Sequence, residues 1–296
     1  MAFSESDLLS LMKTMPAFPH SGYRILKIAN DINHPPKELV KVIEQDPILT
    51  MHLLKLVNSE HFGLAKKITA IKEAVVFLGL NTMKNLALAI APVELLGGGK
   101  EFPKALTSIL RHSLTTAIIA KKLARDLGVN ENQATDCYVA GLLHDFGKVA
   151  LFQLIPQRYE LLLKRSYIPE SSFLDAEMNS ISTTHTVVGE HLGRSWQLPE
   201  LIIRSMGRHH DPESCADSPL LACVYTANLI ANRMLQKHSE SSNDTYPLPP
   251  SLVSLFGRDL ESLSVTMGLI ADEIDQALLL TTIQEDGSLT ESTPHS

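Results

Sequence analysis

Residues 137–148 read CYVAGLLHDFGK, an apolar run followed by a His-Asp pair, and this stretch is the most informative about the fold. The run CYVAGLL predicts a helix packed inside a core, and Gly147 is expected to end it in the left-handed conformation. A His144–Asp145 pair at the buried end of an apolar helix costs free energy unless both groups are satisfied. The stretch therefore predicts either a hydrogen-bonded core histidine or a buried binding site.

Helical periodicity extends to both sides of this stretch, and no run of residues alternates as a strand would. The longest amphipathic pattern runs from residue 106 to 127 and is expected to end at Gly128. Prolines on the amino-terminal side fall between the apolar segments, where they can begin helices. Further helices are expected over residues 47–57, 71–78, 80–96, 184–196, 199–207, 219–235 and 259–281. We therefore predict an all-α protein.

Breaks in the periodic pattern suggest a domain organisation. Gly97–Gly99 forms a joint between two helical lobes, and no Lys-Ser/Thr follows it as a phosphate loop would require. The segment after the second lobe is rich in Ser, Asn and Pro, and the last residues have a disordered composition. The expected parts are an amino-terminal helical lobe (1–99), a second helical lobe (100–237), a loop (238–258), a carboxy-terminal helix (259–283) and a disordered tail (284–296).

Composition narrows the function classes. With 296 residues, 44% hydrophobic and 20% charged, the chain has the composition of an ordinary globular protein. A net charge of −7 gives none of the basic footprint expected for nucleic-acid binding. The sequence shows neither a signal peptide nor an apolar run of the roughly 18 residues that a membrane span needs. Three cysteines without CxxC spacing fit a reducing cytoplasm, so we expect a cytoplasmic protein.

Histidines gather at helix ends and inward faces of the second lobe. His112 lies on the inward stripe of its helix, His185 in an opening turn, and His209–His210 after an amphipathic helix. Each position alone has an ordinary explanation, as a core residue, a solvated N-terminus or a dipole-favoured C-terminus. Together with His144–Asp145 they form a set of imidazole and carboxylate ligands that suits Fe, Mn, Zn or Ni. Because the spacing is not that of a zinc finger, the site would be assembled from several helices.

The order of these motifs resembles the HD superfamily of metal-dependent phosphohydrolases. His112, GLLHDFGK (141–148), His185 and His209–His210 follow one another as in that superfamily. Residues 43–79, IEQDPILTMHLLKLVNSEHFGLAKKITAIKEAVVFLG, closely resemble the HDOD domain, an HD-related output domain of bacterial signalling proteins. The resemblance covers about residues 8–235. It implies an all-α fold, with a helical amino-terminal lobe packed on an HD-like lobe, and a role in signalling.

The resemblance also implies a ligand set for one or two divalent ions. His112, His144 and Asp145 would hold the first metal, and Asp145 would bridge to a second held by His185, His209 and His210. Lys148 matches the lysine that follows the His-Asp pair in active cyclic-dinucleotide phosphodiesterases, where it could meet a phosphate as a point charge.

Two departures from the superfamily pattern concern catalysis. HD hydrolases close the first metal site with an aspartate on a late helix, where this chain has Asn228, a neutral and weaker ligand. The Gly-Tyr-Pro element after the double histidine is also absent, since the chain reads HHDPESCADSP from residue 209.

Two functions remain open on this sequence. The first is a signalling output module that binds a partner signalling protein or a small phosphorylated ligand, and Asn228 favours it. The second is an active phosphohydrolase on a nucleotide or cyclic dinucleotide, with Asp145 and Lys148 as catalytic residues. The intact histidines favour that alternative. The oligomeric state cannot be predicted from the sequence.

Overall fold

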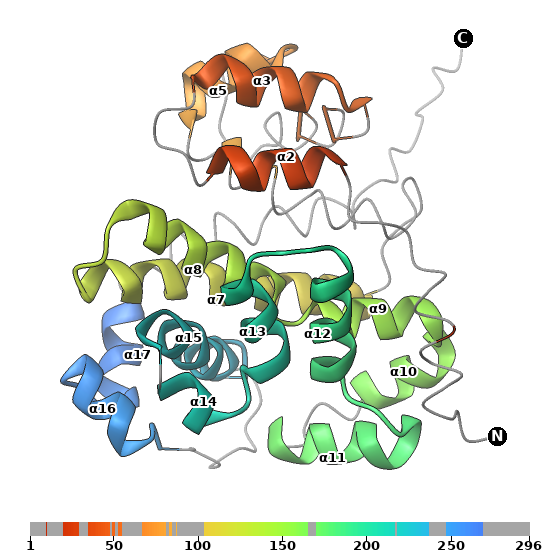
Figure 1. Cartoon of the computed structure of the whole chain (residues 1–296), viewed down its shortest axis with the longest axis vertical. Helices are drawn as coiled ribbons and strands as arrows, with labels where there is room; N and C mark the ends of the chain where they lie inside the picture. The colour runs from red at the N-terminus through yellow and green to blue at the C-terminus, as the bar shows by residue number, and fades with distance from the viewer. Residues whose placement is uncertain are drawn as a thin grey trace, which may run out of the picture.

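Helices make up the regular structure of the described chain, and no strand occurs in it (Figure 1). This computed structural model describes residues 10, 20–29, 35–47, 49–50, 53–54, 67–80, 83–84, 87, 104–164, 170–216, 218–236 and 247–268. The prediction of an all-α protein is confirmed.

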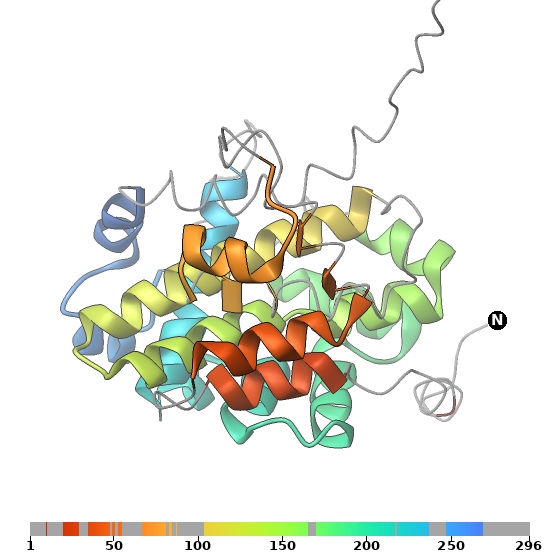
Figure 2. The same cartoon turned by 90° about the horizontal axis from the view of Figure 1, so that it is seen from above.

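A small amino-terminal group consists of three described helices, α2 (His20–Ala29), α3 (Pro36–Glu44) and α5 (Ile71–Leu78). As predicted, prolines open a helix here: Pro35 is the N-cap of α3 and Pro36 its first residue. Helix α5 ends at Gly79, with φ 83°. Viewed from above, this group lies over α7 and α8 (Figure 2). The helices predicted over 47–57 and 80–96 fall largely outside the described residues.

The larger group carries the candidate site. Its helices are α7 (Lys104–Asp126), α8 (Glu131–Leu143), α9 (Phe146–Leu154), α10 (Pro156–Leu163), α11 (Glu170–Ile181), α12 (His185–Ser195), α13 (Glu200–Arg208), α14 (Pro212–Ala216), α15 (Pro219–Gln236), α16 (Pro250–Phe256) and α17 (Leu260–Gly268). Helix α7 packs against both α8 and α15, and α12 packs against α9 and α13. The patterns predicted for α7, α12, α13 and α15 match these bounds to within two residues.

Local sequence explains how α7 gives way to α8. Gly128 has φ 75°, and its N–H donates to the Arg125 carbonyl oxygen at 2.9 Å, so α7 ends where predicted. Two residues later Asn130 begins α8 with a capping box. Its Oδ1 accepts from the Gln133 N–H at 3.0 Å, and Gln133 Oε1 accepts from the Asn130 N–H at 3.3 Å. This short turn joins α7 to α8, and the two helices pack against each other.

Gly147 corrects one sequence prediction. It does not end α8 in the left-handed conformation; it lies inside α9, and its φ is not positive. A β-carbon on Gly147 would come within 1.9 Å of the His185 carbonyl oxygen. Glycine is therefore required here by the close approach of α9 to the start of α12. That contact brings His185 to the end of α8.

The carboxy-terminal part contains a helix where the sequence predicted a loop. Helix α16 forms within residues 238–258, which were predicted to be a loop, and begins at Pro250 behind an N-cap at Pro249. Helix α17 occupies the start of the predicted helix 259–283, whose remainder, with the tail 284–296, lies outside the described residues. Among the described helices, none has the length and apolar character of a membrane span.

Candidate metal centre

The His144–Asp145 pair stands at the junction of α8 and α9. His144 is the C-cap of α8 in right-handed helical conformation, and Asp145 follows with φ −95° and ψ 9°, which interrupts the helix. Their exposed fractions are 0% and 1%. The prediction that this pair lies at the buried end of an apolar helix is confirmed, so both polar groups need partners inside the protein.

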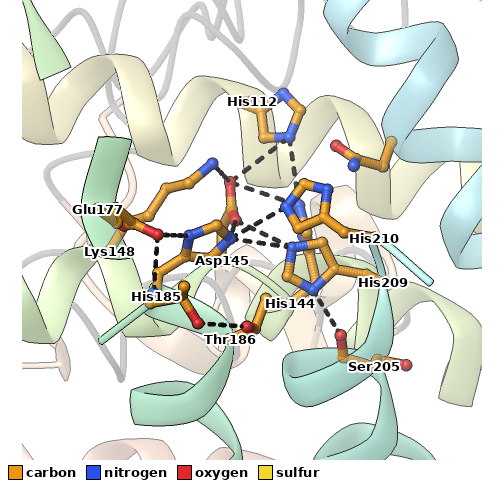
Figure 3. A network of polar contacts seen from close by, with 12 residues as sticks. His112, His144, Asp145, Lys148, Glu177, His185, Thr186, Ser205, His209 and His210 are labelled. Atoms are coloured by element: carbon orange, nitrogen blue, oxygen red, sulfur yellow. Dashed lines mark hydrogen bonds and ion pairs between the residues drawn. The ribbon is translucent and has the colours of Figure 1, made fainter. Parts of the chain in front are cut away.

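Three other elements bring histidines to this junction (Figure 3). His112 comes from the middle of α7, and His185 is the first residue of α12, after the N-cap Thr184. His209 is the C-cap of α13, and His210 follows it. All five predicted histidines therefore surround the Asp145 carboxylate.

The ligand atoms form two groups that share Asp145, each with its ligand atoms within 4.8 Å of one another. The first group is His112, His144 and Asp145, and the second group is Asp145, His185, His209 and His210.

In the first group, Asp145 Oδ2 lies 3.6 Å from His112 Nε2 and 3.5 Å from His144 Nε2. The two histidine Nε2 atoms are 3.2 Å apart. These atoms face one another across a space that a bound cation would fill.

In the second group, Asp145 Oδ1 lies 3.4 Å from both His185 Nε2 and His209 Nε2. His185 Nε2 is 3.3 Å from His209 Nε2 and 3.1 Å from His210 Nε2. The two carboxylate oxygens of Asp145 thus face different groups, which is the arrangement of a bridging ligand.

Hydrogen bonds behind the rings fix which nitrogen carries the proton. His144 Nδ1 donates to the Gly141 carbonyl oxygen at 2.7 Å, and His209 Nδ1 donates to the Ser205 carbonyl oxygen at 2.7 Å. His185 Nδ1 donates to Glu177 Oε2 at 2.8 Å. Because carbonyl and carboxylate oxygens only accept, each Nδ1 carries a proton, and the Nε2 atom of each ring faces Asp145.

This arrangement fits a metal ion. His185 Nε2 and His209 Nε2 lie 3.3 Å apart, and both face Asp145 Oδ1 at 3.4 Å. That carboxylate oxygen is buried and has no hydrogen-bond partner among the described residues. A buried carboxylate oxygen without a hydrogen bond is costly, and a cation beside it would remove that cost. Imidazole and carboxylate together are the donors that Fe, Mn, Zn or Ni accept.

The pKa shifts of His144, His210 and Asp145 also favour metal binding. Burial lowers the pKa of both His144 and His210 well below the usual value, so both are neutral ligands. Burial alone would raise the pKa of Asp145, but the interactions of its carboxylate, foremost with the Lys148 ammonium, outweigh burial and hold that pKa well below its usual value. Asp145 is therefore ionised beside the neutral imidazoles of His144 and His210.

Lys148 supplies the positive charge next to this carboxylate. Its Nζ donates to Asp145 Oδ2 at 2.7 Å across one turn of α9 and lies 5.4 Å from the centre of the Phe173 ring. The side chain is 13% exposed, so the ammonium stands at the margin of the cluster. Sequence reasoning predicted Lys148 as a phosphate contact, whereas here it pairs with Asp145.

Asn228 is the predicted ligand that comes from α15. It is buried in α15, the helix that packs against α7, with an exposed fraction of 1%. Its Oδ1 accepts from Asn232 Nδ2 of the next turn at 3.3 Å. Its role as a ligand of the first group stays a prediction.

Glu177 is a site residue that sequence reasoning missed. It lies on α11 with no exposed surface, and its Oε2 also accepts from the His185 backbone N–H at 3.0 Å. Its Oε1 accepts from the Tyr159 hydroxyl at 2.5 Å. Burial raises the pKa of Glu177, but interactions with His185, including its hydrogen bonds, and the hydrogen bond from Tyr159 outweigh burial and lower the net pKa, so Glu177 is ionised. One acidic residue in an amphipathic helix carries no signal by which the sequence could reveal this contact.

Comparisons with known proteins agree with this geometry. A sequence model of the HDOD domain matches residues 15–212. An uncharacterized protein of Treponema pallidum is 29% identical over 83% of the chain, which covers 47% of that relative. A protein named Ribonuclease Y from Mycoplasma mycoides is 25% identical over 70% of the chain, which covers 45% of it. The chain thus spans about half the length of these curated relatives.

Solved structures of the same architecture exist. An HDOD domain protein of unknown function from Geobacter sulfurreducens superposes with a TM-score of 0.69 at 26% identity, covering 97% of this chain and 100% of the other. A Marinobacter aquaeolei protein assigned to signal transduction gives a TM-score of 0.71 at 19% identity over 94% of this chain and 65% of its own. At that identity the second likeness concerns the fold alone.

Proposed function

Because this chain belongs to the HDOD family, we propose that it is a signalling output module whose His–Asp cluster binds one or two divalent metal ions. The first group would hold one ion and the second group the other, with Asp145 shared between them. Asn228 would complete the first group. The module would act on a partner signalling protein or a small phosphorylated ligand.

The observation that carries this proposal is the orphaned oxygen of Asp145. Asp145 Oδ1 is buried without a hydrogen bond, with two Nε2 atoms facing it at 3.4 Å, and this arrangement is costly unless a cation lies among the three atoms. A histidine cluster that served only the core would direct at least one N–H at this oxygen. The match to the HDOD domain, which resembles an output domain of bacterial signalling proteins, supports the regulatory role.

Metal content of protein purified without chelator or metal-affinity tag tests the proposal. We expect one or two equivalents of Fe, Mn, Zn or Ni per chain by elemental analysis. The double variant His144→Ala/Asp145→Ala should lose all of it, because it removes a ligand of the first group and the ligand that both groups share. Wild-type protein that holds no ion, even after incubation with each metal, would refute the metal centre.

A second candidate, a phosphohydrolase, is favoured by the shared carboxylate and by Lys148. Two metal ions held by these residues would lower the pKa of a bound water and neutralise negative charge on a phosphoester. Within the chain, Asp145 would fix both positions and the Lys148 ammonium would orient a phosphate oxygen after leaving Oδ2. The similarity to a protein named Ribonuclease Y makes a phosphodiester the first substrate to test. Hydrolysis of a cyclic dinucleotide by the Mn²⁺-loaded wild type, absent from the double variant, would establish this candidate.

A further inference from the structure

The Glu177 carboxylate holds His185 from the side opposite Asp145. Both His185 N–H donors that face α11, the backbone N–H and Nδ1–H, bond to Glu177 Oε2 at 3.0 and 2.8 Å (Figure 3). Tyr159 holds the other oxygen of the same carboxylate at 2.5 Å. Glu177, His185 and Tyr159 each have an exposed fraction of 0%. The His185 ring is therefore fixed in position and in tautomer without help from solvent.

This support distinguishes the second group from the first. His144 and His209 donate Nδ1–H to neutral backbone carbonyls, whereas His185 donates to an ionised carboxylate. A carboxylate behind a ligand histidine raises the basicity of its free nitrogen and so strengthens the metal bond. Among the three histidines with these contacts, His185 alone has a charged partner.

The hydrogen bonds of the two Asp145 oxygens also favour metal binding in the second group. Oδ2, which faces the first group, already accepts a hydrogen bond from the Lys148 ammonium at 2.7 Å. Oδ1, which faces the second group, has no hydrogen-bond partner among the described residues. A cation in the second group would satisfy an orphaned acceptor, whereas one in the first group would share an oxygen with an ammonium and be repelled by it.

We propose that Glu177, held by Tyr159, is a positioning residue that makes the second group the tighter of the two metal positions. The inference rests on the proposed function, since it presupposes that the cluster binds metal. It adds that the two positions fill in order: the second group first, and the first group only at higher metal concentration.

Titration of metal-free protein with Zn²⁺ alone, followed calorimetrically, tests the order. In the wild type we expect a tight binding event, with any second event weaker. Glu177→Gln keeps the size of the side chain and removes its charge, and it should weaken the tight event about 10- to 100-fold. Asp175→Asn removes the same charge from an exposed position of the same helix, and it should leave the tight event unchanged.

Two ligand variants identify which group gives the tight event. His112→Ala removes a residue of the first group alone and should leave the tight event intact. His210→Ala removes a residue of the second group alone and should abolish it. The reverse pattern would overturn the proposed order of filling.

A spectroscopic readout separates positioning from a general loss of structure. In long-range ¹H–¹⁵N spectra of the Zn²⁺-loaded protein labelled at histidine, one strongly downfield Nδ1–H proton should belong to His185, because it bonds to a carboxylate. Glu177→Gln should shift that proton upfield while the other metal-bound rings keep their signals. If Glu177→Gln does not fold, Tyr159→Phe replaces it and should weaken the tight event by a smaller factor.

The outcomes distinguish failure of the metal centre from failure of the proposed role of Glu177. Wild-type protein that binds no Zn²⁺ would refute the metal centre and this inference with it. Tight Zn²⁺ binding that Glu177→Gln leaves unchanged would refute the role of Glu177 and leave the metal centre standing. Tight binding that Glu177→Gln and Asp175→Asn weaken equally would show an effect of net charge, and would also overturn the inference.

Discussion

At the scale of single residues, the cluster depends on which atoms face Asp145 and which charges lie behind them. The sequence was sufficient to predict the five histidines and Asp145, because helix-end positions and an inward stripe mark them. It was not sufficient for Glu177 or Tyr159, since neither residue lies in a motif and their contacts depend on how α10, α11 and α12 pack. Gly147 was predicted to be a C-cap, whereas glycine is required there by the close approach of α9 and α12. A close approach between two helices leaves no pattern in the local sequence.

Replacing Asn228 tests why the first group would be the weaker one. Asn228→Asp would add an anionic ligand to the first group, and we expect its Mn²⁺ affinity to rise by at least about tenfold, or about 1.4 kcal/mol. Hydrolysis of bis(p-nitrophenyl) phosphate by the Mn²⁺-loaded variant should rise above that of the wild type if the scaffold is a disabled enzyme.

Asn232→Asp is the matched control for this prediction. It makes the same substitution one turn further along α15. Equal gains in the two variants would assign the effect to the net charge of α15 and contradict a ligand role for residue 228.

At the scale of helices, the ends and crossings position the cluster. His144 ends α8, His185 begins α12 and His209 ends α13, so their placement depends on how these helices are capped and packed. Helical periodicity predicted α12 and α13 well, because an amphipathic stripe repeats over several turns. It missed α16, since a helix of seven residues offers too few turns for a pattern to emerge among Ser and Pro.

The cap of α12 should couple stability to metal binding. Thr184 Oγ1 accepts from the Val187 N–H at 3.4 Å and so fixes the turn that carries His185. Thr184→Ala should cost about 1 kcal/mol of unfolding free energy in urea titrations, and it should also weaken Zn²⁺ binding. Asn130→Ala removes the corresponding cap of α8 and should cost a similar amount without changing Zn²⁺ affinity. Identical Zn²⁺ affinities in both variants would show that the cap does not position His185.

The crossing of α9 and α12 should tolerate no side chain at residue 147. Gly147→Ala would place a β-carbon 1.9 Å from the His185 carbonyl oxygen, so the two helices must separate. We expect a loss of about 3 kcal/mol or more in urea unfolding, at the upper end of overpacking effects. In Gly193→Ala the new β-carbon meets side-chain atoms of Ile203 and Met206 at 3.2 Å, which can shift, and the loss should be smaller. Equal losses would contradict the close approach of α9 and α12.

At the scale of the whole molecule, metal binding and folding should be linked. An ion that binds the folded chain alone stabilises it by about 2.7 kcal/mol when its free concentration is 100 times the Kd. Zn²⁺ should therefore raise the Tm of the wild type in differential scanning calorimetry, and the chelator EDTA should reverse the rise. The double variant His144→Ala/Asp145→Ala should show no rise, and an equal rise in both proteins would indicate binding elsewhere.

The ligand residues come from four separate stretches between positions 112 and 210, and this spread has a consequence for the unfolded chain. Ions held by the two groups, which share Asp145, would act as removable cross-links that close several long loops. Long loops cost little more entropy to close than short ones. Binding of metal ions would therefore stabilise the packing of α7, α8, α12 and α13, and their removal would weaken it. Neither change requires a covalent modification of the protein.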